Sequence, residues 1–240
     1  MNILLTGGSG NLGTELKKIL PNCIAPTKQE LDITNRNQVF DFFKNNSIDV
    51  VIHTAAITKI RFCEENQRIT WDTNVQGTRN IVDAIKKSED NTKFVYISTA
   101  CVFDGHRGMY KESDVPYPEN FYALTKLVAE SEVTKVSNHL IIRTNFVAKK
   151  PWPYPAAFTD RFGTYLFAEN VAKGIKDILD EDLNEIVHLV GDKKISMFEL
   201  AQITSPDIKP MTINDYQGPP LTMDMSLDTE KWKKYSLTRN

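Results

Sequence analysis

The chain has 240 residues, of which 41% are hydrophobic and 25% are charged, and its formal net charge is -2. This composition is typical of a globular protein, and so small a net charge gives no general attraction to nucleic acid or to an anionic membrane. No apolar run is long enough to cross a bilayer, and the segment Met1–Gly7 lacks the features of a signal peptide. We therefore expect a cytoplasmic protein without a nucleic-acid or membrane partner.

Short apolar runs alternate with helical patterns along the chain. The expected strands lie at 3–5, 23–25, 50–52, 94–97, 140–142 and 186–190, and the expected helices at 12–20, around 39–43, 81–85, 124–128 and 168–179. Continuous apolar strands that alternate with helices are typical of a parallel sheet covered on both faces. The predicted fold class is therefore α/β, a Rossmann-type doubly wound parallel sheet with a small C-terminal substrate-binding lobe.

The pattern weakens after Thr144. The segment Lys149–Pro155 contains three prolines and cannot form a regular helix or an inner strand. The predicted division is a dinucleotide-binding core at 1–145, whose sheet is completed by 164–192, and a lobe made of 146–163 and 193–240.

Glycines follow the first predicted strand directly. Gly7, Gly10 and Gly13 are spaced three apart, between that strand and the first helix. Glycines permit a tight turn and a close backbone approach, and a helix N-terminus favours phosphate. A glycine-rich turn without a ligand is the alternative, but this position favours a dinucleotide, with its pyrophosphate over Gly10–Leu12.

The segment after the second predicted strand bears on the choice of cofactor. NAD-selective sites usually place an acidic residue there, against the ribose 2′-hydroxyl. Ala25–Gln29 contains no carboxylate, whereas Thr27 and Lys28 could accept a 2′-phosphate. We therefore predict that NADPH is used at least as well as NADH, the alternative being that Lys28 points to solvent.

Tyr122 and Lys126 are four residues apart in a helical pattern, so their side chains share one face. A free tyrosine has a pKa of about 10, and a neighbouring ammonium lowers it toward the range that suits proton transfer. An ordinary surface pair is the alternative. Ser98 and Thr99 end an apolar strand, at the edge where open α/β sheets bind ligands, so a hydroxyl there could contact the same substrate oxygen.

The glycine turn, the Ser98–Thr99 strand end and the Tyr122/Lys126 pair resemble the extended short-chain dehydrogenase/reductases, within the NAD-dependent epimerase/dehydratase superfamily. Further segments resemble that family's adenine-contacting, cofactor-lining and helical motifs, namely Leu31–Thr34, Asp49–Ala56 and Asn74–Thr78. A narrower resemblance is to the dTDP-4-dehydrorhamnose reductase branch. It is carried by Tyr96–Gly105, by the lead-in Pro118, Asn120 and Tyr122, by Phe158–Thr164, which resembles the branch's Asn-Asp-Gln-x-Gly-Ser, and by Ser226–Lys231.

The resemblance implies site residues in three groups. The catalytic residues are Thr99, Tyr122 and Lys126. The expected cofactor contacts are Gly7, Gly10, Asn11, Leu12, Gly13, Lys28, Asp32, Ile33, Ala55, Ala56, Asn74, Ser98, Tyr122 and Lys126, and the expected substrate contacts are Thr99, Asn145 and Trp152. Asn145 has a turn-stabilising alternative, and packing is the alternative for Trp152. No metal site is expected, since the cysteines and histidines are scattered.

The expected function is NAD(P)H-dependent reduction of a nucleotide-linked 4-keto-6-deoxy sugar, with hydride from nicotinamide and the proton from Tyr122. The alternatives are a nucleotide-sugar epimerase or dehydratase, and a non-catalytic NAD(P)-binding regulator resembling the regulatory β subunit of methionine adenosyltransferase. Family dehydratases carry Asp-Glu after the catalytic Thr, where this chain has Ala100 and Cys101. The sequence leaves the sugar, the nucleotide and the oligomeric state open, a homodimer being one option.

Overall fold

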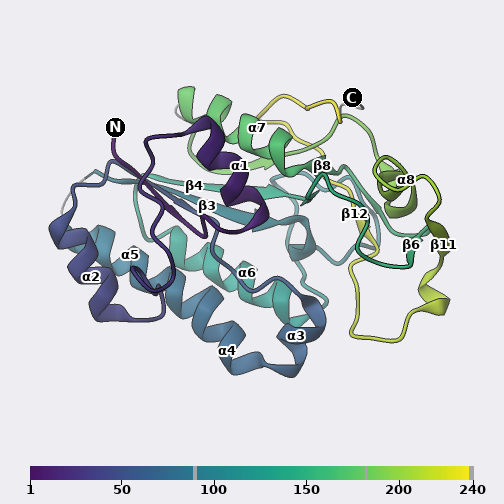
Figure 1. Ribbon diagram of the computed structural model, residues 1–240, viewed down its shortest axis with the longest axis horizontal. Helices are drawn as coiled ribbons and strands as arrows, with labels where there is room; N and C mark the ends of the chain where they lie inside the picture. Colours follow the sequence, from purple (N-terminus) through teal and green to yellow (C-terminus); the bar gives the residue numbers. More distant parts are fainter. Residues whose placement is uncertain (89–90, 182, 238–240) are drawn as a thin grey trace.

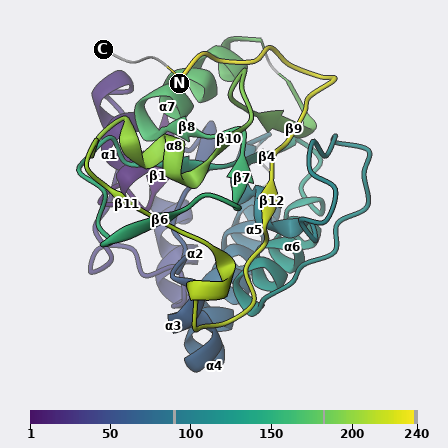
Figure 2. The ribbon, with the colours of Figure 1, turned by 90° about the vertical axis from the view of Figure 1, so that its right-hand side faces the viewer.

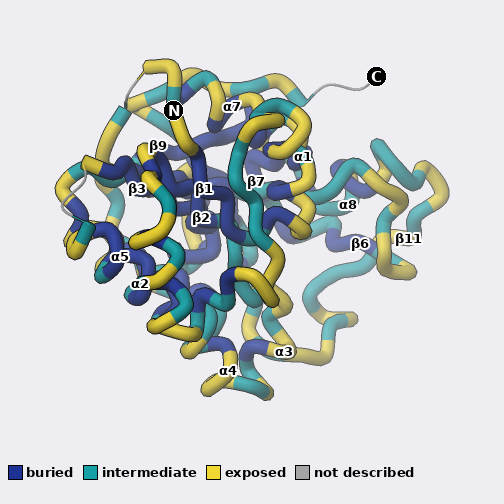
Figure 3. Tube along the Cα trace, turned by 60° about the vertical axis from the view of Figure 1, so that its left-hand side comes forward, coloured by how far each residue is buried: buried dark blue, intermediate teal, exposed yellow. Residues whose placement is uncertain are grey.

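The protein is described by a computed structural model that covers residues 1–88, 91–181 and 183–237. Its centre is a parallel sheet with the strand order β1-β2-β3-β4-β9. The strand bounds are β1 Ile3–Thr6, β2 Val50–His53, β3 Lys93–Thr99, β4 His139–Thr144 and β9 Glu185–Leu189. The predicted Rossmann-type α/β fold is confirmed. In Figure 3 these strands run through the buried interior of the molecule.

Helices cover both faces of the sheet (Figure 1). On one face lie α1 (Asn11–Ile19) and α7 (Ala168–Asp180), and on the other lie α2 (Arg36–Asn45), α5 (Gly77–Ser88) and α6 (Phe121–Val133). Because side chains alternate along a strand, Ile3 and Leu5 pack with α1 and α7, whereas Leu4 packs with α2 and α5. The apolar runs of the sequence are therefore the strands buried on both sides.

The segment expected to be a second strand forms only an isolated bridge, between Leu4 and Ile24. Two backbone hydrogen bonds join it to β1, Leu5 N–H to the Ile24 carbonyl and Ile24 N–H to the Ile3 carbonyl. The weak second strand expected at 23–25 is thus only a one-residue bridge, and the prediction of a strand was wrong. Pro21 and Pro26 enclose this segment, and prolines cannot donate the hydrogen bonds that would extend the pairing.

Three short helices connect β2 to α5. They are α3 (Ile60–Glu65), α4 (Gln67–Trp71) and the π-helix η1 (Asp72–Gln76). The 3-10 turn η2 (Ala100–Val102) follows β3 directly. No helix of the described residues is both long and apolar enough to cross a membrane.

The remaining elements form a lobe that Figure 2 shows from its outer side. Its short strands pair as β10-β7-β12, β11-β6 and β5-β8. Their bounds are β5 Phe146–Val147, β6 Ala156–Phe158, β7 Phe162–Gly163, β8 Leu166–Phe167, β10 Ile195–Ser196, β11 Lys209–Met211 and β12 Asp224–Met225, with α8 Met197–Gln202 and η3 Ile213–Asp215 between them. As expected, the proline segment 149–155 is irregular.

One hydrophobic cluster joins the lobe to the core of the fold. It contains Ala100, Cys101 and Val102 of η2 together with Leu200 of α8 and Met225 of β12. The lobe therefore packs against the chain that leaves the carboxyl end of β3. The domain boundaries expected from the sequence remain a prediction.

Candidate active site

The turn between β1 and α1 requires its glycines. Gly7 has a φ of +74°, and a Cβ atom there would lie 2.6 Å from the Ala55 nitrogen. A Cβ atom on Gly13 would lie 2.3 Å from the Gly7 carbonyl oxygen. The N–H groups of the first turn of α1, at 11–13, have no intrahelical acceptor, as in any helix. The N-cap residue Gly10 has no side chain that could accept from them. Such a turn can bind phosphate.

A cavity of about 240 Å³ opens beside this turn. Of the expected cofactor residues, it brings together Gly7, Lys28, Asp32, Ile33 and Ala55. The expected residues Gly10 to Gly13 come directly after Ser9 in the sequence, and Ala56 directly after Ala55; Ser9 and Ala55 both line the cavity. The cavity has the composition of a dinucleotide site, with backbone from glycines at one end and polar and apolar side chains along its wall.

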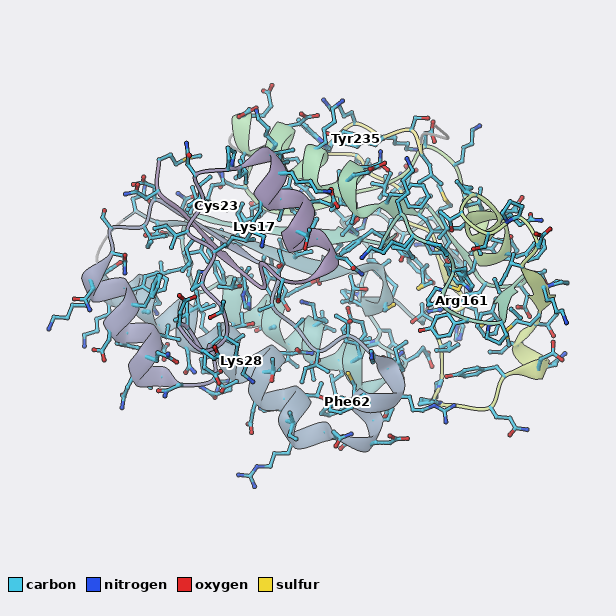
Figure 4. All side chains as sticks on the ribbon, viewed as in Figure 1. Lys17, Cys23, Lys28, Phe62, Arg161 and Tyr235 are labelled. Atoms are coloured by element: carbon cyan, nitrogen blue, oxygen red, sulfur yellow. The ribbon has the colours of Figure 1, made fainter. Side chains whose placement is uncertain are left out.

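Two lysines line this cavity (Figure 4). The Lys28 ammonium lies 3.8 Å from a carboxylate oxygen of Asp32, and the Lys28 side chain is 80% exposed. Burial acts to raise the pKa of Asp32, but hydrogen bonds from Thr34 and the charge of Lys28 outweigh it, so the pKa is lowered. Asp32 is therefore ionised at neutral pH, and it competes with any anion for Lys28.

Lys17 is the lysine that sequence reasoning missed. It comes from α1, and its Cδ atom lies 3.8 Å from the position of a Cβ on Gly8. The side chain thus crosses the glycine turn toward the cavity. The signal was present in the sequence, because Lys17 is four residues after Gly13 and therefore on the same face of the helix.

Asn74 lies in the π-helix η1 and its side chain is fully engaged with the protein. Its oxygen accepts from Ile57 N–H, and its amide donates to the Ile57 carbonyl and to the Thr125 hydroxyl. π-Helical turns are frequent at functional sites. The contacts tie the loop after β2 to α6, and the expected cofactor contact of Asn74 stays a prediction.

The three expected catalytic residues come from β3 and α6. Thr99 ends β3, and its Oγ1 accepts a hydrogen bond of 3.1 Å from Cys101 N–H, which leaves its own O–H free to donate. Lys126 is buried; its ammonium donates to the Ile97 carbonyl at 2.7 Å and lies 4.1 Å from the ring centroid of Tyr96. Tyr122, one helical turn before Lys126, packs against the cluster around Cys101.

Burial sets the proton affinities of this pair. It lowers the pKa of Lys126 from its ordinary value to about 7, against an opposing effect of the Glu130 carboxylate. It raises the pKa of Tyr122, and the Thr99 hydroxyl beside the phenol acts in the opposite direction. The expected lowering of this pKa by a neighbouring ammonium is therefore wrong for the ligand-free protein, in which the Lys126 ammonium lies on the Ile97 carbonyl. In the ligand-free protein the phenol therefore keeps its proton at neutral pH and can act as a proton donor.

Ser98 is directed at a buried ion pair. Its hydroxyl donates to a Glu130 oxygen, and both Glu130 oxygens accept from Arg143, at 3.0 and 2.7 Å. The two charged side chains are only 5% and 3% exposed. This network holds the end of β3 against α6, and nothing in the sequence pattern pointed to Glu130 or Arg143.

The other two expected substrate residues, Asn145 and Trp152, both reach the cluster that includes Met225. Asn145 follows β4, and its amide nitrogen is 3.7 Å from the Met225 sulfur. Trp152 lies in the irregular segment, where its indole N–H donates to the Ala156 carbonyl at 3.2 Å. The structure thus brings Asn145 to the cluster that includes Cys101, and the Trp152 ring packs against the same cluster, with its indole N–H already used within the lobe. The described residues contain no cluster of His, Cys, Asp or Glu that could hold a metal ion.

Comparisons with known proteins agree with this geometry. The family described as the RmlD substrate binding domain matches residues 1–152. A dTDP-4-dehydrorhamnose reductase of Aggregatibacter actinomycetemcomitans is 32% identical over 60% of this chain, and the match spans 51% of that relative's length. The Escherichia coli dTDP-4-dehydrorhamnose reductase is 26% identical, over 98% of this chain and 91% of its own length.

Solved structures give the same result. A dTDP-4-dehydrorhamnose reductase from Clostridium acetobutylicum matches with a TM-score of 0.85 and 27% identity, over 95% of this chain and 90% of its own. One from Bacillus anthracis, solved in complex with NADP, matches with a TM-score of 0.90 and 23% identity, over 99% and 96%.

Proposed function

The chain belongs to the RmlD substrate-binding domain family, and on that premise we propose that it is an NAD(P)H-dependent reductase of a dTDP-linked 4-keto-6-deoxy sugar. The observation that supports this proposal is the Thr99 hydroxyl beside the Tyr122 phenol at the end of β3, with the Lys126 ammonium held on the Ile97 carbonyl of the same strand. A hydroxyl that is free to donate and a phenol that is protonated at neutral pH lie side by side there.

The residues around the glycine turn fit a dinucleotide. A side chain at Gly7 or Gly13 would collide with backbone, so the cradle is kept open by glycine alone. The first-turn N–H groups would hold the pyrophosphate, and Asp32 and Ile33 would contact the adenine end. Lys28, with Lys17 across the cavity, would meet a 2′-phosphate, which supports NADPH as a substrate at least as good as NADH.

The chemistry assigned to the chain is proton transfer and orientation. When bound, the reduced nicotinamide supplies a hydride to the carbonyl carbon of the sugar. Tyr122 gives its phenol proton to the carbonyl oxygen, so that the ketone becomes an alcohol and the tyrosine becomes a phenolate, which water reprotonates. The Thr99 hydroxyl donates a hydrogen bond to the same oxygen and fixes its position. The Lys126 ammonium stabilises the phenolate by its charge.

The segment after Thr99 supports ketone reduction over 4,6-dehydration. Dehydration needs a further acid and base, which family dehydratases supply as Asp-Glu directly after the catalytic Thr. Ala100 has no ionisable group, and the Cys101 sulfur lies 3.4 Å from the Met225 sulfur in the hydrophobic cluster. An unactivated thiol is a poor replacement for a carboxylic acid, since its pKa is about 8.5.

Two incubations test the proposal. NADPH should be consumed with a ready-made dTDP-4-keto-6-deoxy sugar, and the absorbance at the nicotinamide band reports the rate. With dTDP-glucose or UDP-glucose and no reductant, no 4-keto-6-deoxy product should form. Formation of that product would establish a dehydratase instead. The absence of turnover with any keto sugar, in a protein that still binds NADPH, would favour the non-catalytic regulator.

The proposal extends to the organisation of the protein. Residues 1–145 with 164–192 would bind the cofactor, whereas 146–163 and 193–240 would shape the substrate pocket. The cytoplasm is the proposed compartment. A homodimer is the assembly to test, and light scattering on the purified protein decides between it and a monomer.

A further inference from the structure

Arg161 is a buried cation in the connection between β6 and β7. Its side chain lies in the lobe (Figure 4), and the residue is only 8% exposed. Its Nε–H donates to the Thr222 carbonyl at 2.9 Å. One terminal nitrogen lies 3.9 Å from the Met197 sulfur and the other lies 3.2 Å from the Met225 sulfur. The backbone holds the residue in place, because Met197 N–H donates to its carbonyl.

The Arg161 guanidinium has more N–H donors than the surrounding acceptors can satisfy. It carries five N–H groups, and of its three nitrogens only Nε meets an oxygen atom; thioether sulfur is a weak acceptor. Within the part of the chain that the structure describes, no carboxylate lies within 4 Å of it. Buried arginines are almost always paired, because an unpaired buried charge is costly. The Arg161 side chain therefore lacks an anionic partner among the described residues.

A second donor beside Arg161 also lacks a partner. The Tyr165 hydroxyl is buried and its residue is 1% exposed. The Asn145 side chain lies close enough to lower the pKa of this phenol, but no hydrogen bond of regular geometry reaches the hydroxyl from the described residues. The phenol and the Asn145 amide lie together, because a Cβ atom on Gly163 would be 2.8 Å from Tyr165 Cζ and 2.9 Å from Asn145 Nδ2. Burial raises the pKa of this phenol, and the Arg161 charge acts in the opposite direction. The Thr222 hydroxyl, on the residue whose carbonyl Arg161 contacts, is also buried and has no partner among the described residues.

These donors adjoin the catalytic edge of the sheet. The Met225 sulfur, which contacts Arg161, also lies 3.4 Å from the Cys101 sulfur and 3.7 Å from the Asn145 amide nitrogen. Cys101 is in the turn that follows Thr99, and Asn145 follows β4. A single methionine thus separates the guanidinium from the catalytic strand end, and a methionine side chain can move aside at low cost because it is flexible.

We propose that Arg161 binds an oxyanion of the substrate, with the Asn145 amide and the Tyr165 hydroxyl as further donors, and that it determines substrate specificity. A planar guanidinium suits phosphate and carboxylate equally, in bidentate geometry. The oxyanion is the nucleotide diphosphate or a carboxylate on the sugar. In the segment that resembles Asn-Asp-Gln-x-Gly-Ser, Arg161 stands at the position of the neutral Gln, so this cation is a departure of this chain. The inference rests on the proposed function for the identity of the substrate class only.

The experiment measures binding without turnover, so it stands even if the reductase assay fails. Calorimetric titrations of NADP⁺-loaded protein use dTDP, dTDP-glucose, UDP-glucose and UDP-glucuronate as probes. The variants are Arg161→Gln and Arg161→Lys, and the matched control is Lys194→Gln, which removes a cation of the same lobe that is paired with Asp224 at the surface.

Arg161→Gln should weaken binding of the affected probes about 10-fold or more, because charge-assisted hydrogen bonds are lost. The affinity of Arg161→Lys should lie between that of Arg161→Gln and that of the wild type. Equal losses for dTDP and all three nucleotide sugars identify the diphosphate. A loss confined to UDP-glucuronate identifies a sugar carboxylate. The control should bind every probe as the wild type does.

Thermal unfolding separates this role from a structural one. Because Arg161→Gln removes an unpaired buried charge, the ligand-free variant should unfold at the same or a higher temperature than the wild type. A lower unfolding temperature together with unchanged affinity for all four probes would show that Arg161 only holds the Thr222 carbonyl, and would overturn the proposal.

Discussion

Replacing Tyr122 by phenylalanine isolates the proton donor. The change removes one hydroxyl group and no carbon atom, so the ring keeps its contacts with the cluster around Cys101. We therefore expect the free energy of unfolding to change by no more than about 1.5 kcal/mol, the net contribution of one hydrogen bond. Since the glycine turn lies on β1 and α1, the dissociation constant of NADPH should change by no more than about twofold, or ~0.4 kcal/mol.

The expected loss of turnover is much larger. General acid catalysis is typically worth about 100- to 10,000-fold, which corresponds to roughly 2.7–5.5 kcal/mol of activation free energy at about 1.36 kcal/mol per factor of ten. The structure offers little replacement, because the Lys126 ammonium is engaged with the Ile97 carbonyl. The decrease should therefore appear in kcat and in kcat/KM together, as for an interaction made in the transition state.

The assay is NADPH oxidation with a saturating keto sugar, with NADPH binding measured by fluorescence on the same preparation. Tyr117→Phe is the control, since Tyr117 is 68% exposed and its hydroxyl makes no hydrogen bond with the described residues. If Tyr122→Phe kept near-full turnover, the proton would come from elsewhere, and the assignment built on Thr99 and Tyr122 would fail.

Four other predictions follow from the same structure. Gly13→Ala should abolish NADPH binding in calorimetry while the circular dichroism spectrum is retained, because its Cβ would lie 2.3 Å from backbone. Lys17→Ala and Lys28→Ala should each raise the KM for NADPH by up to about fivefold and leave the KM for NADH unchanged, as expected for exposed ion pairs. Glu130→Gln should lower the unfolding free energy in urea by about 3–5 kcal/mol, because its buried arginine partner is left unpaired. Between pH 7 and 8.5 the stability of the ligand-free protein should rise with pH, since folded Lys126 loses its proton near pH 7 and unfolded lysine keeps its proton to about 10.5. The slope from Lys126 is at most about 1.4 kcal/mol per pH unit, and a Lys126→Met variant without that contribution checks it.

The central sheet could be predicted from the sequence because apolar runs such as Val50–Ile52 are buried on both faces, and burial on both faces produces an uninterrupted run. The prediction of a strand around Ile24 failed for a related reason. A short apolar run such as Cys23–Ala25 looks the same in the sequence whether it forms a strand or a single bridge at the sheet edge. Two-residue strands such as β7 and β12 are too short for any periodicity to register.

The candidate site was predictable only where one segment carries it. The glycine turn and the Tyr122/Lys126 spacing are local, so the sequence displays them directly. The pair of Glu130 with Arg143 joins α6 to β4, and the contacts of Met225 join Arg161, just before β7, to β12 and the end of β4. These contacts depend on the tertiary fold, and a single sequence gives no sign of which charged residues are buried. Lys17 could be predicted in part, since the sequence shows which face of the helix it occupies but not the cavity that it lines.

The most direct test of the proposed ketone reduction follows the hydride itself. The protein is incubated with NADPH that carries deuterium at the transferable C4 position of the nicotinamide and with a dTDP-4-keto-6-deoxy sugar, and the product is examined by NMR. Hydride transfer to the carbonyl carbon should place one deuterium at C4 of the sugar for each NADPH oxidised. A product without deuterium at that carbon, or an unchanged keto sugar beside unconsumed NADPH, would contradict it.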